Sequence, residues 1–162
     1  MQSRSPEELL GLADAVISRV PRGTQAEATI SATATALTRF ANGAIHQNVA
    51  DTTVRIRLRV IRDGRAGVVE VQGADDQVAA SIVDSAERVR AASPRGAPVP
   101  LLTPDGGGDS ETGYSEATAG FSPEQRADAV ATVCDAARDA GQVAFGTCET
   151  VTTTTVLASS AG

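Results

Sequence analysis

The sequence of 162 residues contains no lysine and no tryptophan, and His46 is its single histidine. Without lysine, the chain can supply neither a Schiff-base lysine nor the lysine of a phosphate-binding loop, which excludes nucleotide hydrolysis of that type. A single histidine excludes metal motifs built on two histidines. We therefore assign no catalytic, cofactor-binding or metal-ligating residue in this chain.

Aromatic and basic residues are also too few for a nucleic-acid-binding protein. The chain has four aromatic residues in all, a formal net charge of −6 and a pI near 4.7. Nucleic-acid-binding domains usually carry a basic surface, and those that bind single strands add aromatic stacking platforms. We expect no nucleic-acid partner.

Long hydrophobic runs are absent as well. The N-terminal stretch MQSRSPEELL lacks the apolar segment of a signal peptide, and no stretch approaches the length of a membrane span. We expect a cytoplasmic protein with no membrane partner. In that compartment Cys134 and Cys148 are predicted to be free thiols, with Cys134 on the apolar face of a helix.

The first part of the chain reads as a helix, a run of strands and a second helix. Ser5 begins a capping box, and Asp75 or Asp76 caps the second helix, which ends at Ser93-Pro94. Asn42-Gly43 and Asp63-Gly64 are typical of tight hairpin turns, because both dipeptides tolerate positive φ. The predicted strands span residues 28–37, 44–50, 53–62 and 65–72.

The second part begins with a segment rich in proline and glycine. Residues 93–121 have no sustained periodicity and predict a loop. A second capping box at Ser122 opens a helix that ends at Gly141, and residues 150–156 predict a threonine-rich strand. We therefore expect an α+β fold in which an antiparallel meander sheet packs under helices. Its predicted parts are residues 1–92 (helix, four-strand meander, helix), residues 93–121 (loop) and residues 122–162 (helix and strand, of the same N-terminal domain).

The helix and strand predicted at the start of the chain resemble those predicted at its end, which suggests a weak internal repeat. SPEE, helix and threonine-rich strand are matched by SPEQ, helix and threonine-rich strand. The first strand has a returning partner after Asn42-Gly43, whereas the second has none after it. The chain is thus expected to be a fragment of a longer protein, or its last strand pairs elsewhere in the sheet.

An arginine stripe is the most unusual feature of this acidic chain. In residues 53–67, TVRIRLRVIRDGRAG, Arg55, Arg57 and Arg59 occupy every second position and so share one face of a strand. That face is either the solvated side of a half-buried sheet or a surface that binds acidic groups on a partner or substrate. The three arginines are the partner-binding or substrate-binding candidates.

His46 lies on the predicted returning strand. Alternation places Ile45 and Val49 toward the core and His46 and Asn48 outward, which favours a surface residue over a catalytic one.

Two stretches carry a resemblance to a known family. ALTRFANGAIHQNVADTTVRIRLRVIRDGRAG with the helix VAASIVDSAERVRAASP, and FGTCETVTTTTVLASSAG near the end, resemble the N-terminal domain of the TldD/PmbA family. These metallopeptidase-related proteins are also described as modulators of DNA gyrase. The sequence of the hairpin is more similar to the PmbA (TldE-like) type than to the TldD type. Ser159 stands where the family usually has asparagine.

The resemblance implies a subunit of a proteolytic assembly. Paired subunits, as a homodimer or heterodimer, enclose a chamber in which unfolded peptides are cleaved at a zinc site. In catalytic members the zinc lies in a later domain, on a His-Glu-x-x-x-His helix, and this sequence has no His-Glu pair. The implied role is subunit pairing and peptide binding without hydrolysis by this chain, and whether the full protein is an enzyme stays open. The alternative is a self-contained α+β binding module with no role in proteolysis.

Overall fold

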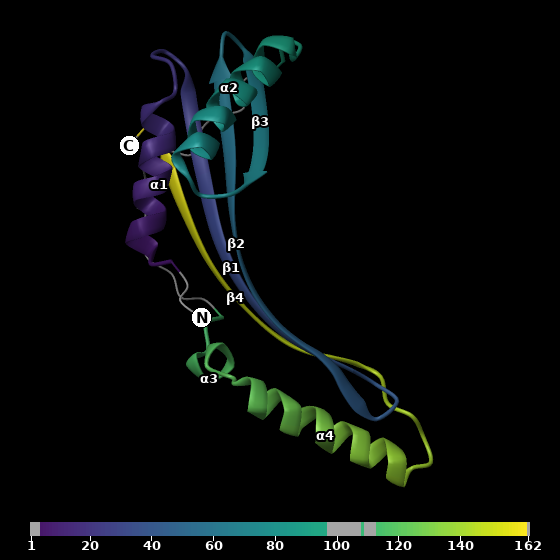
Figure 1. Ribbon diagram of the computed structural model, residues 1–162. Helices are drawn as coiled ribbons and strands as arrows, with labels where there is room; N and C mark the ends of the chain where they lie inside the picture. The colour runs from purple at the N-terminus through teal and green to yellow at the C-terminus, as the bar shows by residue number, and fades with distance from the viewer. Residues whose placement is uncertain (1–3, 97–107, 109–112, 162) are drawn as a thin grey trace. The chain divides into compact units, whose positions relative to one another are not determined.

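The computed structural model describes residues 4–96, 108 and 113–161, which form helices on an antiparallel sheet (Figure 1). The elements in chain order are α1 (Pro6–Ser18), β1 (Gln25–Ala41), β2 (Ala44–Arg62), β3 (Arg65–Gln72), α2 (Asp76–Ala92), α3 (Glu116–Ala119), α4 (Pro123–Asp139) and β4 (Gly146–Ser159). The strands lie in the order β3-β2-β1-β4. The predicted α+β class is confirmed.

Both predicted hairpin turns are present. Asn42 and Gly43 have φ values of 51° and 72°, and Asp63 and Gly64 have 52° and 69°. These are the left-handed values that a two-residue type I′ turn requires, and asparagine, aspartate and glycine reach them at low cost. The two turns make β1, β2 and β3 consecutive antiparallel strands.

The prediction of two strands at 44–50 and 53–62 is wrong, because β2 is continuous from Ala44 to Arg62. The Asp51-Thr52 pair stays extended and makes no turn. The part before residue 92 therefore holds three strands instead of four.

The last strand has a partner. The backbone N–H of Ser160 donates to the Ala26 carbonyl at 2.9 Å, and the hydroxyl oxygens of Ser31 and Thr155 lie 3.0 Å apart. The partners run in opposite directions along the chain, so β4 pairs antiparallel with β1. The second explanation for the last strand, pairing elsewhere in the sheet, is therefore confirmed.

The described residues group into two compact units. The α1/α2 unit contains residues 4–32, 53–96, 108 and 154–161, and the α4 unit contains residues 33–52 and 113–153. Strands β1, β2 and β4 contribute to both. The predicted division at residues 92 and 121 stays a prediction.

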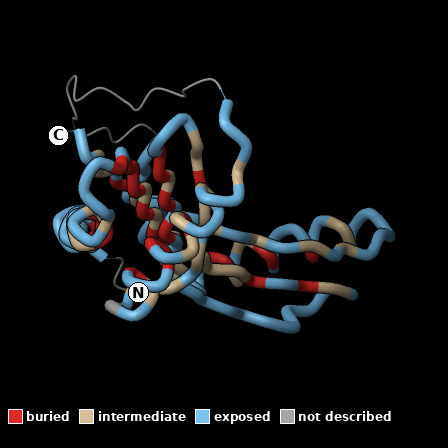
Figure 2. Tube along the Cα trace, turned by 90° about the horizontal axis from the view of Figure 1, so that it is seen from above, coloured by how far each residue is buried: buried red, intermediate tan, exposed pale blue. Residues whose placement is uncertain are grey.

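The α1/α2 unit holds the larger apolar core, whose buried positions are red in Figure 2. It gathers apolar side chains from α1, α2, β1 and β2, with Val156 from β4. Gly67 on β3 lets α2 approach closely, because a Cβ there would lie 2.6 Å from the Arg90 nitrogen and would also collide with the Ala86 carbonyl. Helix α1 begins with the predicted capping box at Ser5, and Asp75 caps α2 through the Val78 N–H at 2.7 Å.

The α4 unit has a smaller core. Phe40, Val130 and Cys134 are buried together, and Ala144 and Cys148 pack against them. Gly146 lies directly beside the Phe40 ring, since a Cβ there would be 3.2 Å from Phe40 Cζ. The second predicted capping box, at Ser122, is also present.

The predicted loop 93–121 is described only in part. Helix α3 lies within it, and its N-cap Ser115 accepts a hydrogen bond from the Thr118 N–H at 3.3 Å. Residues 97–107 and 109–112 lie outside the described part of the chain, so the loop as a whole stays a prediction.

Candidate functional site

The arginine stripe lies on β2 in the α1/α2 unit, on the sheet face opposite the helices. Ile56, Leu58 and Val60 are buried in the core beneath α1 and α2, and the intervening arginines point the other way. Arg55 and Arg57 are exposed, whereas Arg59 is only partly exposed. The alternation predicted from the sequence is therefore present in the strand.

Carboxylates reduce the positive charge of this stripe. Arg59 forms an ion pair with Glu27 of β1, whose side chain is only 10% exposed. Arg57 stands opposite Glu70 of β3, and Arg55 stands opposite the neutral Gln72. Residues opposite each other in an antiparallel pair project to the same face. The group most available to an acidic partner is thus Arg55, followed by Arg57, while Arg59 already neutralises a buried acid.

Sequence reasoning missed a buried arginine in the α4 unit. Arg126 is 2% exposed and donates to three neutral acceptors: Thr38 Oγ1 at 3.2 Å, the Phe121 carbonyl at 2.8 Å and Asn48 Oδ1 at 3.3 Å. Buried charge is tolerated only when its hydrogen bonds are satisfied. Arg126 therefore ties the start of α4 to β1 and β2, a structural role with no opening to solvent.

A signal for Arg126 was present in the sequence. Arg126, Val130 and Cys134 are spaced four residues apart and so share one helical face, which is the face that α4 buries. A charged residue at a position on the apolar face of a helix has two explanations. Either its side chain reaches solvent at the end of the helix, or it makes a buried polar contact. The structure shows the second.

The orientation predicted for the strand around His46 is wrong for Ile45 and Val49 but not for His46 and Asn48. Ile45 and Val49, expected in the core, are 44% and 38% exposed. Asn48 is exposed, as expected, and its Oδ1 also accepts a hydrogen bond from Arg126 Nη2 at 3.3 Å. His46 is exposed as expected, and its Nε2 lies 3.0 Å from the Ala41 carbonyl oxygen near the hairpin turn.

Shallow depressions on the surface of the described residues include two that are lined by polar side chains. One, of about 490 Å³, lies at the tip of the β1–β2 hairpin and is lined by His46, Arg39, Phe40 and Phe145 among others. The other, of about 460 Å³, lies along α2 between Ser81 and Arg88.

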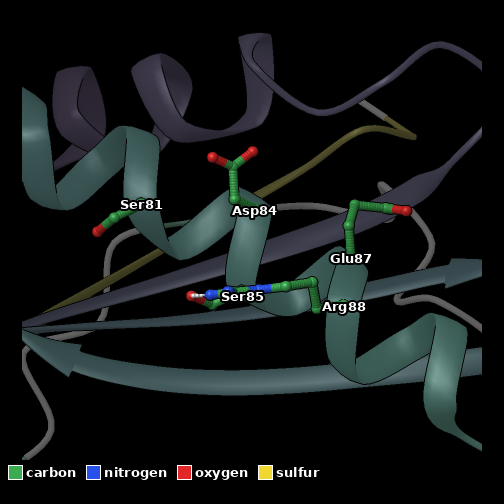
Figure 3. A pocket seen from close by; sticks show the side chains of 5 residues that line it. All are labelled: Ser81, Asp84, Ser85, Glu87 and Arg88. Carbon is green, nitrogen blue, oxygen red and sulfur yellow. Dashed lines mark hydrogen bonds between the residues drawn. The ribbon is translucent and has the colours of Figure 1, made fainter.

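Figure 3 shows the side chains that line the α2 depression. Arg88 Nη2 donates to Ser85 Oγ at 3.0 Å, and the Asp84 carboxylate points away from that pair. All five lining side chains come from one helix and include no histidine or cysteine.

Within the described residues, no group of three or more histidine, cysteine, aspartate or glutamate side chains is placed to hold a metal ion. Cys134 is buried and Cys148 is half-buried, and both are free thiols, as predicted. None of the described helices is long and apolar enough to span a membrane.

The chain was compared with known proteins by sequence and by structure. No protein-family model matches the sequence, and no curated protein matches it. Solved structures do match the fold. TldE from Thermococcus kodakarensis superposes with a TM-score of 0.76 over 96% of this chain, at 15% identity.

Two further solved structures share the fold. A proposed modulator of a DNA gyrase from Thermotoga maritima has a TM-score of 0.72 over 98% of this chain at 15% identity. A proposed modulator of DNA gyrase from Bacteroides thetaiotaomicron has a TM-score of 0.63 over 96% at 13% identity. The chain spans 35–36% of the length of these three proteins. The predicted resemblance to the TldD/PmbA proteins is thus confirmed at the level of the fold.

Proposed function

We propose that this chain acts as the N-terminal domain of a TldE/PmbA-type protein, pairing with a second subunit of a proteolytic assembly and helping to bind unfolded peptides. Hydrolysis then belongs to a zinc site outside this chain. The observation that carries the proposal is the likeness to the TldE structure over 96% of the chain, together with the hairpin sequence that first suggested it.

The arginine stripe supports an interaction role. Arg55 and Arg57 are exposed side chains on a sheet face that α1 and α2 leave uncovered. Exposed ion pairs contribute about 0.2–1 kcal/mol each and weaken as salt screens them. Acidic groups on a partner subunit or a peptide fit this surface.

The experiment measures assembly and hydrolysis separately. The chain is mixed with a TldD-type subunit carrying the His-Glu-x-x-x-His helix, and co-elution and cleavage of an unfolded, labelled protein are followed. We expect co-elution and zinc-dependent cleavage by the mixture, and no cleavage by this chain alone. Failure to co-elute, or cleavage by the chain alone, would overturn the proposal.

A double variant tests the arginines. Arg55→Gln with Arg57→Gln is expected to weaken association by about threefold to tenfold at low salt, because two exposed ion pairs are lost. Arg62→Gln is the matched control, since Arg62 lies on the same strand and is also exposed. Equal binding by the double variant and the control would remove Arg55 and Arg57 from the interface.

The second candidate is a self-contained α+β binding module. The observation that favours it is that each unit buries an apolar core of its own among the described residues. Such a module should unfold cooperatively as a monomer and show no affinity for a TldD-type subunit. Aggregation on isolation, or co-elution with that subunit, would count against it.

A further inference from the structure

The depression at the tip of the β1–β2 hairpin combines a cationic group with an apolar one. Its volume of about 490 Å³ lies within the range of about 300–1,000 Å³ that is typical of ligand pockets. The side chains that line it include Arg39, His46 and the aromatic ring of Phe145. All of the lining residues belong to the α4 unit. This combination limits the kind of molecule that fits the depression.

The pairing of β1 with β4 determines which lining side chains share a face of the sheet. Three contacts along these strands agree on one register: Ala26 with Ser160, Ser31 with Thr155, and Thr33 with Thr153. Continued toward the hairpin tip, this register places Thr147 opposite Arg39 and Gly146 opposite Phe40. The contact between Gly146 and the Phe40 ring agrees with it. Because Phe40 is buried with residues of α4, Arg39 and Thr147 lie together on the face away from that helix.

The β1–β2 turn adds His46 to the same row of side chains. A two-residue turn at Asn42-Gly43 pairs Ala41 with the residue after the turn, so Arg39 pairs with His46. His46 Nε2 donates to the Ala41 carbonyl, 3.0 Å away, because a carbonyl oxygen can only accept. This bond orients the imidazole at the edge of the depression. Thr147, Arg39 and His46 therefore form a polar row across three strands.

Arg39 is a cation without an acidic partner in the part of the chain that the structure describes. Its side chain is exposed and makes no ion pair and no hydrogen bond with any described residue. The residues that line the depression include no aspartate and no glutamate. Glu149 lies two residues beyond Thr147 on β4 and forms no ion pair with Arg39 either. A bound anion would therefore meet a charge that no described carboxylate neutralises.

Phe145 supplies an apolar surface next to this cation. It directly precedes β4 and is 81% exposed, the highest exposed fraction among the large apolar side chains that the structure describes. Its position two residues before Thr147 makes it a diagonal neighbour of Arg39, at a distance of about 7–8 Å. An inorganic anion would bind Arg39 and leave the ring in water, whereas a purely apolar ligand would leave the guanidinium unpaired. The ligand that uses both groups carries a carboxylate close to a large apolar group.

We propose that this depression binds the C-terminal residue of a peptide, with its carboxylate at Arg39 and its apolar side chain against Phe145. In a C-terminal residue the carboxylate and the side chain leave the same carbon atom, so they can reach two neighbouring groups at once. Arginine is suited to a carboxylate because it can donate two parallel hydrogen bonds to it. The inference rests on the peptide binding of the proposed function and names the end of the peptide that is recognised.

The test compares two peptides that differ only at the C-terminus. A fluorescently labelled peptide that ends in phenylalanine with a free carboxylate is titrated with the full chain, and its anisotropy is measured. The same peptide with a C-terminal amide is titrated in parallel. We expect the free acid to bind about threefold to tenfold more tightly at low salt, because the amide cannot pair with the exposed guanidinium. This comparison leaves the protein unchanged, so it does not depend on the folding of a variant.

Substitutions in the protein locate the binding site. Arg39→Gln should abolish the preference for the free acid and leave the affinity for the amide unchanged. Arg138→Gln is the matched control, because Arg138 is exposed on α4 and does not line the depression. Phe145→Ala should weaken the binding of both peptides by about fivefold, since the terminal ring loses its contact. Val143→Ala should not, because Val143 is also exposed but lies outside the lining.

Several outcomes would overturn the inference. They are equal affinity for the acid and the amide, no binding at millimolar peptide, and equal effects of Arg39→Gln and Arg138→Gln. Phenylacetate that binds as tightly as the peptide would show that a small acid, and not a peptide, is the ligand. Co-elution with a TldD-type subunit is a separate measurement. If it fails while the preference for the free acid remains, the subunit pairing of the proposed function is removed alone; if it succeeds without that preference, this inference is removed alone.

Discussion

Helices α1 and α4 begin alike and are anchored differently. Each opens with Ser-Pro-Glu and a complete capping box. Helix α1 buries Leu9, Ala13 and Val16. Helix α4 buries Arg126, Val130 and Cys134. The shared start signal fixes where a helix begins, but it carries no information about what holds the helix on the sheet.

Different interactions anchor the two helices on the sheet: apolar burial holds α1, and hydrogen bonds from Arg126 hold α4. Apolar burial is proportional to area and is not directional, so α1 is held by the amount of surface that it removes from water. The Arg126 guanidinium holds α4 through hydrogen bonds of fixed geometry to β1, β2 and Phe121. We expect α1 to contribute more stability and α4 to depend more on precise orientation.

The largest expected effect is at the α1 anchor. Leu9→Ala should lower the free energy of unfolding by about 2–5 kcal/mol, because a fully buried leucine leaves a cavity in the main core. Urea denaturation followed by circular dichroism measures the change.

Leu10→Ala is the matched control for Leu9→Ala. Leu10 is the next residue on the same helix and is 42% exposed, so its loss should change the free energy of unfolding by less than about 1 kcal/mol. Equal effects at the two positions would show that α1 is not anchored through Leu9.

A smaller effect is expected at the α4 anchor. Arg126→Met keeps the length of the side chain and removes its donors, which leaves the buried Thr38 hydroxyl and the Phe121 carbonyl without that partner. Such losses cost about 1–3 kcal/mol. Thermal denaturation of the full chain, followed by NMR through the amide signals of α4, measures this loss of stability.

A double-mutant cycle separates the hydrogen bond from the packing. Thr38→Val removes the acceptor of Arg126 Nε, so the two substitutions together should cost less than their sum by about 0.5–3 kcal/mol. Arg138→Met is the control, because Arg138 lies on the same helix and is exposed. Additive effects of Arg126→Met and Thr38→Val would mean that the hydrogen bond contributes nothing.

Much of the fold could be predicted because its signals are local. The capping boxes at Ser5 and Ser122 and the turn at Asn42-Gly43 each depend on a few adjacent residues, and all three are present. The continuity of β2 could not be predicted in the same way. Asp51 and Thr52 are compatible with a turn, but in the structure they continue the long strand β2.

The candidate site was less predictable, because its electrostatics depend on partners distant in sequence. Alternation correctly placed Arg55, Arg57 and Arg59 on one face, but the ion pair between Arg59 and Glu27 joins two strands and leaves no local pattern. The hydrogen bond between Arg126 and Asn48 could not be predicted for the same reason, since Arg126 lies on a helix that follows much later in the chain.

The smallest expected effect sharpens the comparison at the helix starts. A hydrogen bond from its own backbone N–H, and then one from the Ser5 hydroxyl, lower the pKa of Glu7 below its ordinary value. Hydrogen bonds from the Glu124 backbone N–H and from the Ser122 hydroxyl lower the pKa of Glu124 in the same way. The positive charge of Arg126 lowers it further, and it has no such effect on Glu7. A lowered pKa in the folded state means that the contribution to stability is present above the ordinary pKa and is lost as pH falls through the folded value.

Carbon-13 NMR titration of the two carboxyls tests this prediction. Both midpoints should lie below the ordinary glutamate value, and Ser5→Ala should raise the pKa of Glu7 alone, while Ser122→Ala raises that of Glu124 alone. Arg126→Met should raise the pKa of Glu124 and leave that of Glu7 unchanged, because the charge of Arg126 lowers the pKa of Glu124 and is not among the causes of the lowering at Glu7. Equal changes in the pKa of Glu7 and Glu124 in Arg126→Met would mean that the two helix starts do not differ. The difference between α1 and α4 would then lie only in the residues that each helix buries.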